Sequence, residues 1–155
     1  MALGSSKFDR RKTNMAATRP ELSEKSKWWI SKHRYYELRH FCLQYPDWVS
    51  MISDIDGLPS SSPERHEHIN QGRHSDPTAV YAETREFLMR KISLVDKAAF
   101  EASNHQFWYT ILLEAVTTGS SYDILEARKG IMPVSRNEWY DVYRKFFWYL
   151  DKLRD

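Results

Sequence analysis

Residues 121–153 read SYDILEARKGIMPVSRNEWYDVYRKFFWYLDKL, and this stretch holds the clearest start and stop signals for helices in the chain. Ser120 or Ser121 can cap a short helix over residues 122–128, because a serine oxygen accepts a bond from a free amide of the first turn. Gly130 follows directly and is a typical residue to end a helix. The first part of the stretch therefore predicts a short capped helix.

A second helix is expected after a turn at residues 131–134. Ser135 and Glu138 have the spacing of a capping box, in which each side chain bonds the other residue's backbone amide. The apolar residues that follow recur at helical spacing and predict a broad stripe facing the core. This stripe comprises Trp139, Val142, Tyr143, Phe146, Phe147, Leu150 and Leu153.

Two helices are predicted in the first third of the chain. The first runs from about residue 23 to residue 45 and is ended by Pro46, which then opens a shorter helix that closes at Gly57. The apolar face expected for the first helix comprises Trp29, Tyr36, Leu38, Phe41, Leu43 and Tyr45. The face expected for the second comprises Trp48, Met51, Ile52 and Ile55.

A polar stretch at residues 57–75 predicts a loop, and order resumes at Asp76 and Pro77, a helix cap and a first-turn proline. The long helix expected to follow ends near Ala102. Its predicted buried stripe is Val80, Phe87, Leu88, Ile92, Val95 and Ala99. Asn104 can break this helix, and a further helix is expected over residues 107–116, closed by Gly119.

These elements predict an all-α fold, a small helical bundle with a C-terminal helix-turn-helix and a disordered basic N-terminal arm. The arm is expected at residues 1–22 and the N-terminal helices at 23–56. The polar loop follows at 57–75. A helical domain is expected at 76–155, with the helix-turn-helix at about 121–153.

Composition excludes several classes of protein. Hydrophobic residues make up 41% of the chain and aromatic residues 14%, which excludes wholesale disorder. Cys42 is the single cysteine, so an internal disulfide is impossible, and we expect a buried thiol. No apolar run approaches the roughly 18 residues of a membrane span, and the N-terminus lacks a signal-peptide core. We expect a cytoplasmic protein with no membrane association.

Charge is distributed unevenly around a net value of +2. Residues 1–40 carry 10 Lys and Arg against 4 acidic residues, and residues 41–118 carry 6 against 11. Residues 119–155 carry 7 against 6. A basic segment joined to an acidic middle is compatible with binding double-stranded DNA through the basic part, or with a merely solvated basic tail.

The second helix of the C-terminal pair offers candidate DNA contacts. With its apolar stripe turned inward, the residues expected to face outward are Arg136, Asn137, Tyr140, Asp141, Arg144 and Lys145. Arg136 and Asn137 suit bidentate contacts to guanine and adenine edges in the major groove. Arg144 and Lys145 lie farther along the helix, where contacts to DNA phosphates are expected. Arg128 and Lys129, before the turn, can add contacts to the DNA backbone.

The segment also resembles small phage sigma-factor-like transcription regulators, the late-transcription activators and autolysin regulators of the RinA/ArpU type. The matching features are Gly119/Ser121/Tyr122, Gly130/Ile131/Pro133/Ser135 and Tyr140/Arg144/Lys145/Phe147, and the likeness covers about residues 28–153. Met132 lengthens the turn relative to that pattern, and Glu138 and Asp141 place negative charge on the expected DNA face. The resemblance implies transcription control in a phage or prophage.

Other functions stay open from the sequence. The chain can be a protein-binding module that occupies RNA polymerase or a host defence complex, or a DNA-packaging adaptor like small terminase subunits, and a homodimer is compatible with each. No nucleophile elbow or phosphate loop is present, so we expect no enzyme and no cofactor. His66, Glu67, His68 and His74 match no standard zinc spacing, so no metal site is expected.

Overall fold

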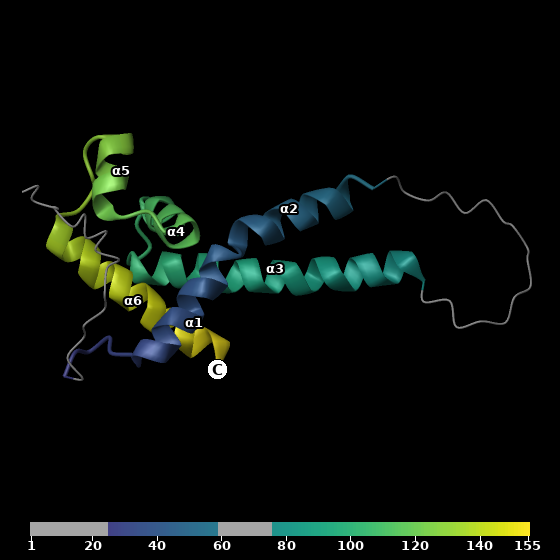
Figure 1. Ribbon diagram of the computed structural model, residues 1–155, viewed down its shortest axis with the longest axis horizontal. Helices are drawn as coiled ribbons and strands as arrows, with labels where there is room; N and C mark the ends of the chain where they lie inside the picture. Colours follow the sequence, from purple (N-terminus) through teal and green to yellow (C-terminus); the bar gives the residue numbers. More distant parts are fainter. Residues whose placement is uncertain (1–24, 59–75) are drawn as a thin grey trace, which may run out of the picture.

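The computed structural model describes residues 25–58 and 76–155, and these residues form six helices and no strand (Figure 1). The helices are α1 Lys32–Leu43, α2 Tyr45–Asp56, α3 Pro77–Ala102, α4 Tyr109–Thr118, α5 Tyr122–Lys129 and α6 Arg136–Arg154. The prediction of an all-α fold is confirmed for this part of the chain.

The long helix α3 is the centre of the arrangement. Its C-terminal half packs against α6 and α4, and its N-terminal half packs against α2. Figure 1 shows α2 and the first half of α3 extending away from the other helices as a pair, which we call the α2–α3 hairpin (residues 45–58 and 77–90). α5 and the start of α6 lie at the opposite end of the molecule.

The core forms around the apolar stripe of α6. Trp139, Phe146, Phe147 and Leu150 are almost completely buried, and Val142 and Leu153 pack at its edge. The Phe147 ring meets the Tyr35 ring of α1 edge to face, with 4.8 Å between ring centroids. Edge-to-face geometry is favourable for aromatic pairs. The stripe predicted from spacing is therefore the stripe that α1 and α3 cover.

Several predicted helix ends are confirmed. The Asp76 side chain accepts a hydrogen bond from the Thr78 amide (3.0 Å), Pro77 opens α3, and the helix ends at Ala102. Gly119 and Gly130 end α4 and α5 with φ of 71° and 84°, a region that glycine enters without a side-chain clash. Local capping chemistry fixes these boundaries.

The first predicted helix is wrong in its start and in part of its buried face. α1 begins at Lys32, because the Ser31 hydroxyl caps the helix by accepting from the Arg34 amide (3.3 Å). Residues 25–30 instead lie along α6, where the Trp28 ring meets the Trp148 ring at 5.1 Å between centroids. The buried α1 residues are Tyr35, Leu38 and Cys42. Burial also raises the pKa of the Cys42 thiol, as expected of an enclosed cysteine.

Several residues predicted on apolar helix faces are exposed, and Met51 of α2 is one of them, at 52%. Val80 and Phe87 of α3 are 43% and 57% exposed, because α2 is the one helix beside them and covers only the face around Leu88. Phe107 is 83% exposed, and α4 begins two residues later, at Tyr109. The left-handed conformations of Asn104 and His105 form the break that separates α3 from α4.

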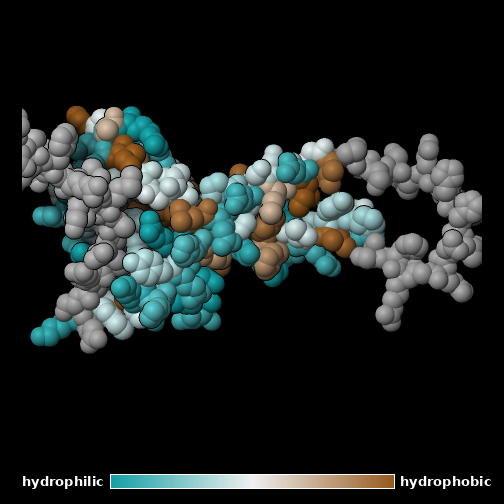
Figure 2. All heavy atoms as spheres, viewed as in Figure 1, coloured by the Kyte–Doolittle hydropathy of each residue, from teal (hydrophilic) through white to brown (hydrophobic). Residues whose placement is uncertain are grey.

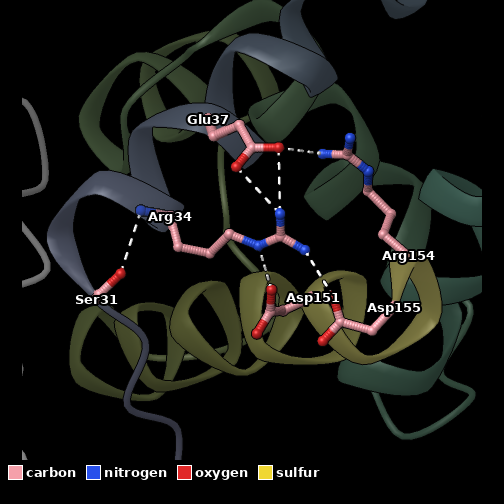
Figure 3. A network of polar contacts seen from close by, with 6 residues as sticks. All are labelled: Ser31, Arg34, Glu37, Asp151, Arg154 and Asp155. Atoms are coloured by element: carbon pink, nitrogen blue, oxygen red, sulfur yellow. Dashed lines mark hydrogen bonds and ion pairs between the residues drawn. The ribbon is translucent and has the colours of Figure 1, made fainter.

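A network of charges joins α1 to the end of α6 (Figure 3). The Arg34 guanidinium pairs with Asp151, with Asp155 at 3.0 Å and with Glu37 at 3.0 Å. Arg154 pairs with the same Glu37 carboxylate at 3.3 Å. Because each partner is already held by another, the network costs less side-chain entropy per pair than isolated pairs would.

Some predictions fall on residues that the structure does not describe. The N-terminal arm at 1–22 lies outside the described residues, as does the polar stretch that holds His66, His68 and His74. Within residues 25–58 and 76–155, no helix is long and apolar enough to cross a membrane.

Candidate nucleic-acid interface

Tyr122 positions α5 against the start of α6. Its ring lies edge-on to the Trp139 ring, with 6.1 Å between centroids. Its hydroxyl donates a hydrogen bond to the Val134 carbonyl (3.1 Å) in the connecting turn. Met132, the residue that lengthens this turn, is 8% exposed and belongs to the core. The longer turn is therefore anchored by an apolar side chain rather than looped out.

The predicted capping box at the start of α6 is confirmed. The Ser135 hydroxyl accepts from the Glu138 amide (3.4 Å), and the Glu138 carboxylate accepts from the Ser135 amide (3.0 Å) and hydroxyl (2.8 Å). These bonds hold the pKa of the Glu138 carboxyl below its usual range. Glu138 therefore turns back to cap the helix and stays ionised there.

The exposed side of α6 in its first three turns holds most of the predicted contacts. Arg136, Tyr140 and Arg144 follow at intervals of four residues and share one face, and Asn137 lies beside them. The Asn137 side chain is exposed and makes no hydrogen bond to another described residue. Tyr140 is half-buried, because its ring packs at the edge of the core.

Arg136 is held on α5 by two contacts. Its guanidinium pairs with the Asp123 carboxylate and lies over the Tyr122 ring, 5.2 Å from the centroid. Both side chains of the ion pair are about half exposed, at 51% and 62%. An exposed pair of this kind is weak and exchanges readily for another anion.

The side chains of Arg144 and Lys145 make more contacts within the chain than the sequence predicts. An Arg144 terminal nitrogen lies 3.4 Å from Asp141, and its buried Nε has no hydrogen-bond partner among the described residues. The Lys145 ammonium lies 5.6 Å from the centroid of the Trp28 ring and donates to the Asn104 side chain. Burial lowers the pKa of Lys145. The prediction that Lys145 points outward is wrong in this respect: the side chain packs residues 25–30 onto α6.

Arg128 and Lys129, at the end of α5, share one carboxylate. Glu114 of α4 lies 2.6 Å from Lys129 and 3.0 Å from Arg128. Lys129 first, and then Arg128, hold the pKa of the Glu114 carboxyl below its usual range. The two cations are therefore present at the edge of the face, partly neutralised by a residue on another helix.

The structure brings six of the seven predicted residues to the end of the molecule formed by α5 and the first half of α6 (Figure 1). They are Arg128, Lys129, Arg136, Asn137, Tyr140 and Arg144. Sequence reasoning missed the acidic partners Glu114 and Asp123, which lie 14 and 13 residues from Arg128 and Arg136. The nearly equal numbers of basic and acidic residues in 119–155 were the one signal in the sequence that these cations have acidic partners.

A second feature is an open hollow of about 500 Å³ beside α3 and α4, lined by residues that include Met89, Asp96, Phe100 and Tyr109. The Tyr45 hydroxyl donates to the Asp96 carboxylate (2.8 Å), and burial raises the pKa of Asp96. No His or Cys is among the residues that line it. No group of three or more metal-binding side chains occurs in the described residues.

Comparison of the chain with protein-family models, curated proteins and solved structures gives no match. The resemblance to phage regulators therefore stays a prediction from the sequence motifs.

Proposed function

We propose that the chain is a DNA-binding transcription regulator, and that α5, the turn and α6 act as a helix-turn-helix. The observation that carries the proposal is the exposed face of α6, where Arg136, Asn137, Tyr140 and Arg144 lie together on a helix with a well-formed N-terminal cap. An α-helix fits the major groove, and its first turns approach the base edges.

The residues of this face have distinct roles in the proposal. Arg136 reads a guanine and Asn137 an adenine, because these side chains match the donor and acceptor patterns of those bases. Arg128, Lys129 and Arg144 contact phosphates, which sets the register of the helix without reading sequence. Lys145 has a structural role in the proposal, because its ammonium packs against the ring of Trp28.

The ion pairs on this face are compatible with DNA binding. Exposed pairs contribute only about 0–1 kcal/mol each. A phosphate beside several cations is a stronger competitor, because binding also releases the counterions condensed on DNA. Arg136 would leave Asp123 on binding, and Arg128 and Lys129 would leave Glu114. The free protein thus holds its cations in place, at a cost in affinity for DNA.

Selection from a pool of random duplex DNA tests the proposal. The full chain is immobilised, bound duplexes are amplified over several rounds, and the enriched sequences are compared with those of Arg136→Ala and Asn137→Ala. We expect one enriched motif, relaxed at a guanine in the first variant and at an adenine in the second. Arg90→Ala, which alters an exposed arginine on α3, should select the wild-type motif. No enrichment would contradict the proposal.

A protein-binding function is the second candidate. The observation that favours it is the apolar surface of the α2–α3 hairpin, where Met51, Leu58, Val80 and Phe87 are exposed. Contiguous exposed apolar patches on proteins often mark sites of interaction with other proteins. RNA polymerase, a host defence complex and the ring of a packaging adaptor are the partners that this candidate function leaves open.

A further inference from the structure

The outer half of the α2–α3 hairpin has almost no core. Every residue from Pro77 to Phe87 is exposed, over three turns of α3. In the described part of the hairpin the buried side chains are Trp48, Ile52 and Leu88. Figure 2 shows apolar side chains at the surface of this region. Helical turns without tertiary packing are marginal in water, so these turns need a partner.

The exposed apolar residues share one side of the hairpin. Val80 and Phe87 are seven residues apart and lie on one face of α3, Met51 lies on α2, and Leu58 follows two residues after the end of α2 at Asp56. The Lys91 ammonium joins the two faces, because it lies 5.1 Å from the centroid of the Trp48 ring and 4.3 Å from that of the Phe87 ring. We call Met51, Leu58, Val80 and Phe87 the hairpin face.

The charges around this face differ between the two helices. On α2, Asp47 and Asp54 share a helix face with Met51. On α3, Glu83 lies between Val80 and Phe87 on the stripe, and Lys91 borders it. None of these four charged side chains has an ion-pair partner among the described residues. At the end of the face nearest the other helices, Asp47 and Lys91 carry opposite charges that can pair between two copies.

We propose that the hairpin face binds the same face of a second copy of this chain, so that α2 of each protomer lies on α3 of the other in a four-helix bundle. A two-fold axis parallel to the hairpin gives this pairing. Rotation about such an axis leaves each residue at the same height along the axis in both copies. Because Lys91 lies over the Trp48 ring, Asp47 of one copy then comes level with Lys91 of the other. Met51 comes level with Phe87 in the same way.

Residues 59–75 of the same chain are disfavoured as the occupant by their sequence. Residues 59–75 contain a single large apolar residue, Ile69, and cannot supply the apolar surface that the face requires. The pairing is independent of the proposed DNA binding, because the hairpin lies at the end of the molecule opposite α5 (Figure 1).

Sedimentation equilibrium of the full chain over a wide concentration range tests the pairing. We expect a monomer–dimer equilibrium in the wild type. Phe87→Glu should raise the dissociation constant at least about 100-fold, because the charge enters the dimer twice and one central interface residue alone is worth about 30-fold. Phe107→Glu is the matched control, since Phe107 is 83% exposed and lies outside the hairpin; it should dimerise as the wild type does. Circular dichroism at a concentration where the wild type is also a monomer checks that both variants keep the helicity of the wild type.

Charge reversal tests the register. Asp47→Lys and Lys91→Glu should each weaken the dimer, and the double variant should regain most of the wild-type dissociation constant. A monomer at all concentrations, a ring larger than a dimer, or a dimer that survives Phe87→Glu would overturn the pairing. Failure of the double variant to recover would overturn the placement of α2 on α3.

Discussion

Arg136, the first residue of α6, pairs with Asp123 in the first turn of α5, and its guanidinium lies over the ring of Tyr122, the residue before that acid. The pair bridges the two helices across the turn. The side chain proposed to read a base is therefore held by a carboxylate in the free protein, and the proposed DNA binding requires Arg136 to leave Asp123 for the edge of a guanine.

Removal of that carboxylate should tighten DNA binding. Asp123→Asn frees Arg136 and removes a negative charge from the proposed interface, so we expect affinity to rise about 2- to 5-fold, the range that an exposed ion pair supports. Fluorescence anisotropy with the selected duplex measures the change. Asp56→Asn, which breaks a similar exposed pair with Arg85 on the hairpin, is the control. An unchanged affinity in Asp123→Asn would show that Arg136 does not reach the DNA.

Glu114 should contribute to stability only above acid pH. Lys129 and Arg128 lower the pKa of Glu114 in the folded chain, so its contribution is present above the unfolded value of about 4.3 and is lost as pH falls through the folded value. Glu114→Gln should lower the free energy of unfolding by roughly 0.5 kcal/mol at neutral pH, a magnitude reduced by solvent screening. Urea denaturation of both proteins at a series of pH values below neutral follows the loss. A difference that does not decrease as the pH falls would contradict this assignment.

Trp139 should be among the most important side chains for stability. It is 1% exposed and meets the rings of both Trp108 and Tyr122, so it joins α6 to the start of α4 and to α5. Trp139→Ala should cost about 3–5 kcal/mol in the free energy of unfolding, from lost burial and the cavity left behind. Ile131→Ala, at a site 97% exposed, should change it by less than about 0.5 kcal/mol. Chemical denaturation compares the two.

The Arg34 network should stabilise the contact between α1 and the end of α6. Arg34→Gln leaves three carboxylates without their shared cation, and we expect a loss of about 1 kcal/mol at low salt that diminishes as salt is added. Arg90→Gln removes a single exposed pair with Glu86 one turn away and should cost about 0.5 kcal/mol at most. Equal losses in the two variants would show that the network adds nothing beyond isolated pairs.

Much of the fold could be predicted from sequence, because local chemistry sets most helix ends. Asp76 with Pro77, Ser135 with Glu138, and Gly130 each act within one turn, and each boundary appears where the sequence places it. The α6 stripe could be predicted for a related reason: seven apolar residues at helical spacing leave one possible inward face.

The wrong predictions concern residues whose burial or ion pairing depends on a contact with a residue far away in the sequence. Trp28 packs on α6 and Trp29 stays 40% exposed, a choice set by the α6 surface rather than by spacing. Val80 and Phe87 fit a helical stripe, but α2 covers only the adjacent face. Glu114 and Asp123 reach their cations through tertiary packing, so the sequence placed the candidate interface without showing how far its charge is neutralised.

A salt-dependent titration tests whether the exposed face of α6 binds DNA. Wild type, Arg136→Ala/Arg144→Ala and the charge-matched control Arg85→Ala/Arg90→Ala are titrated into labelled selected duplex and unrelated duplex at two salt concentrations. We expect tight, sequence-selective binding that weakens with salt, is retained in the control and collapses in the α6 variant. The salt slope of that variant should fall by about 0.9 for each phosphate that it no longer neutralises. No binding, or equal binding by the α6 variant and the control, would contradict the account.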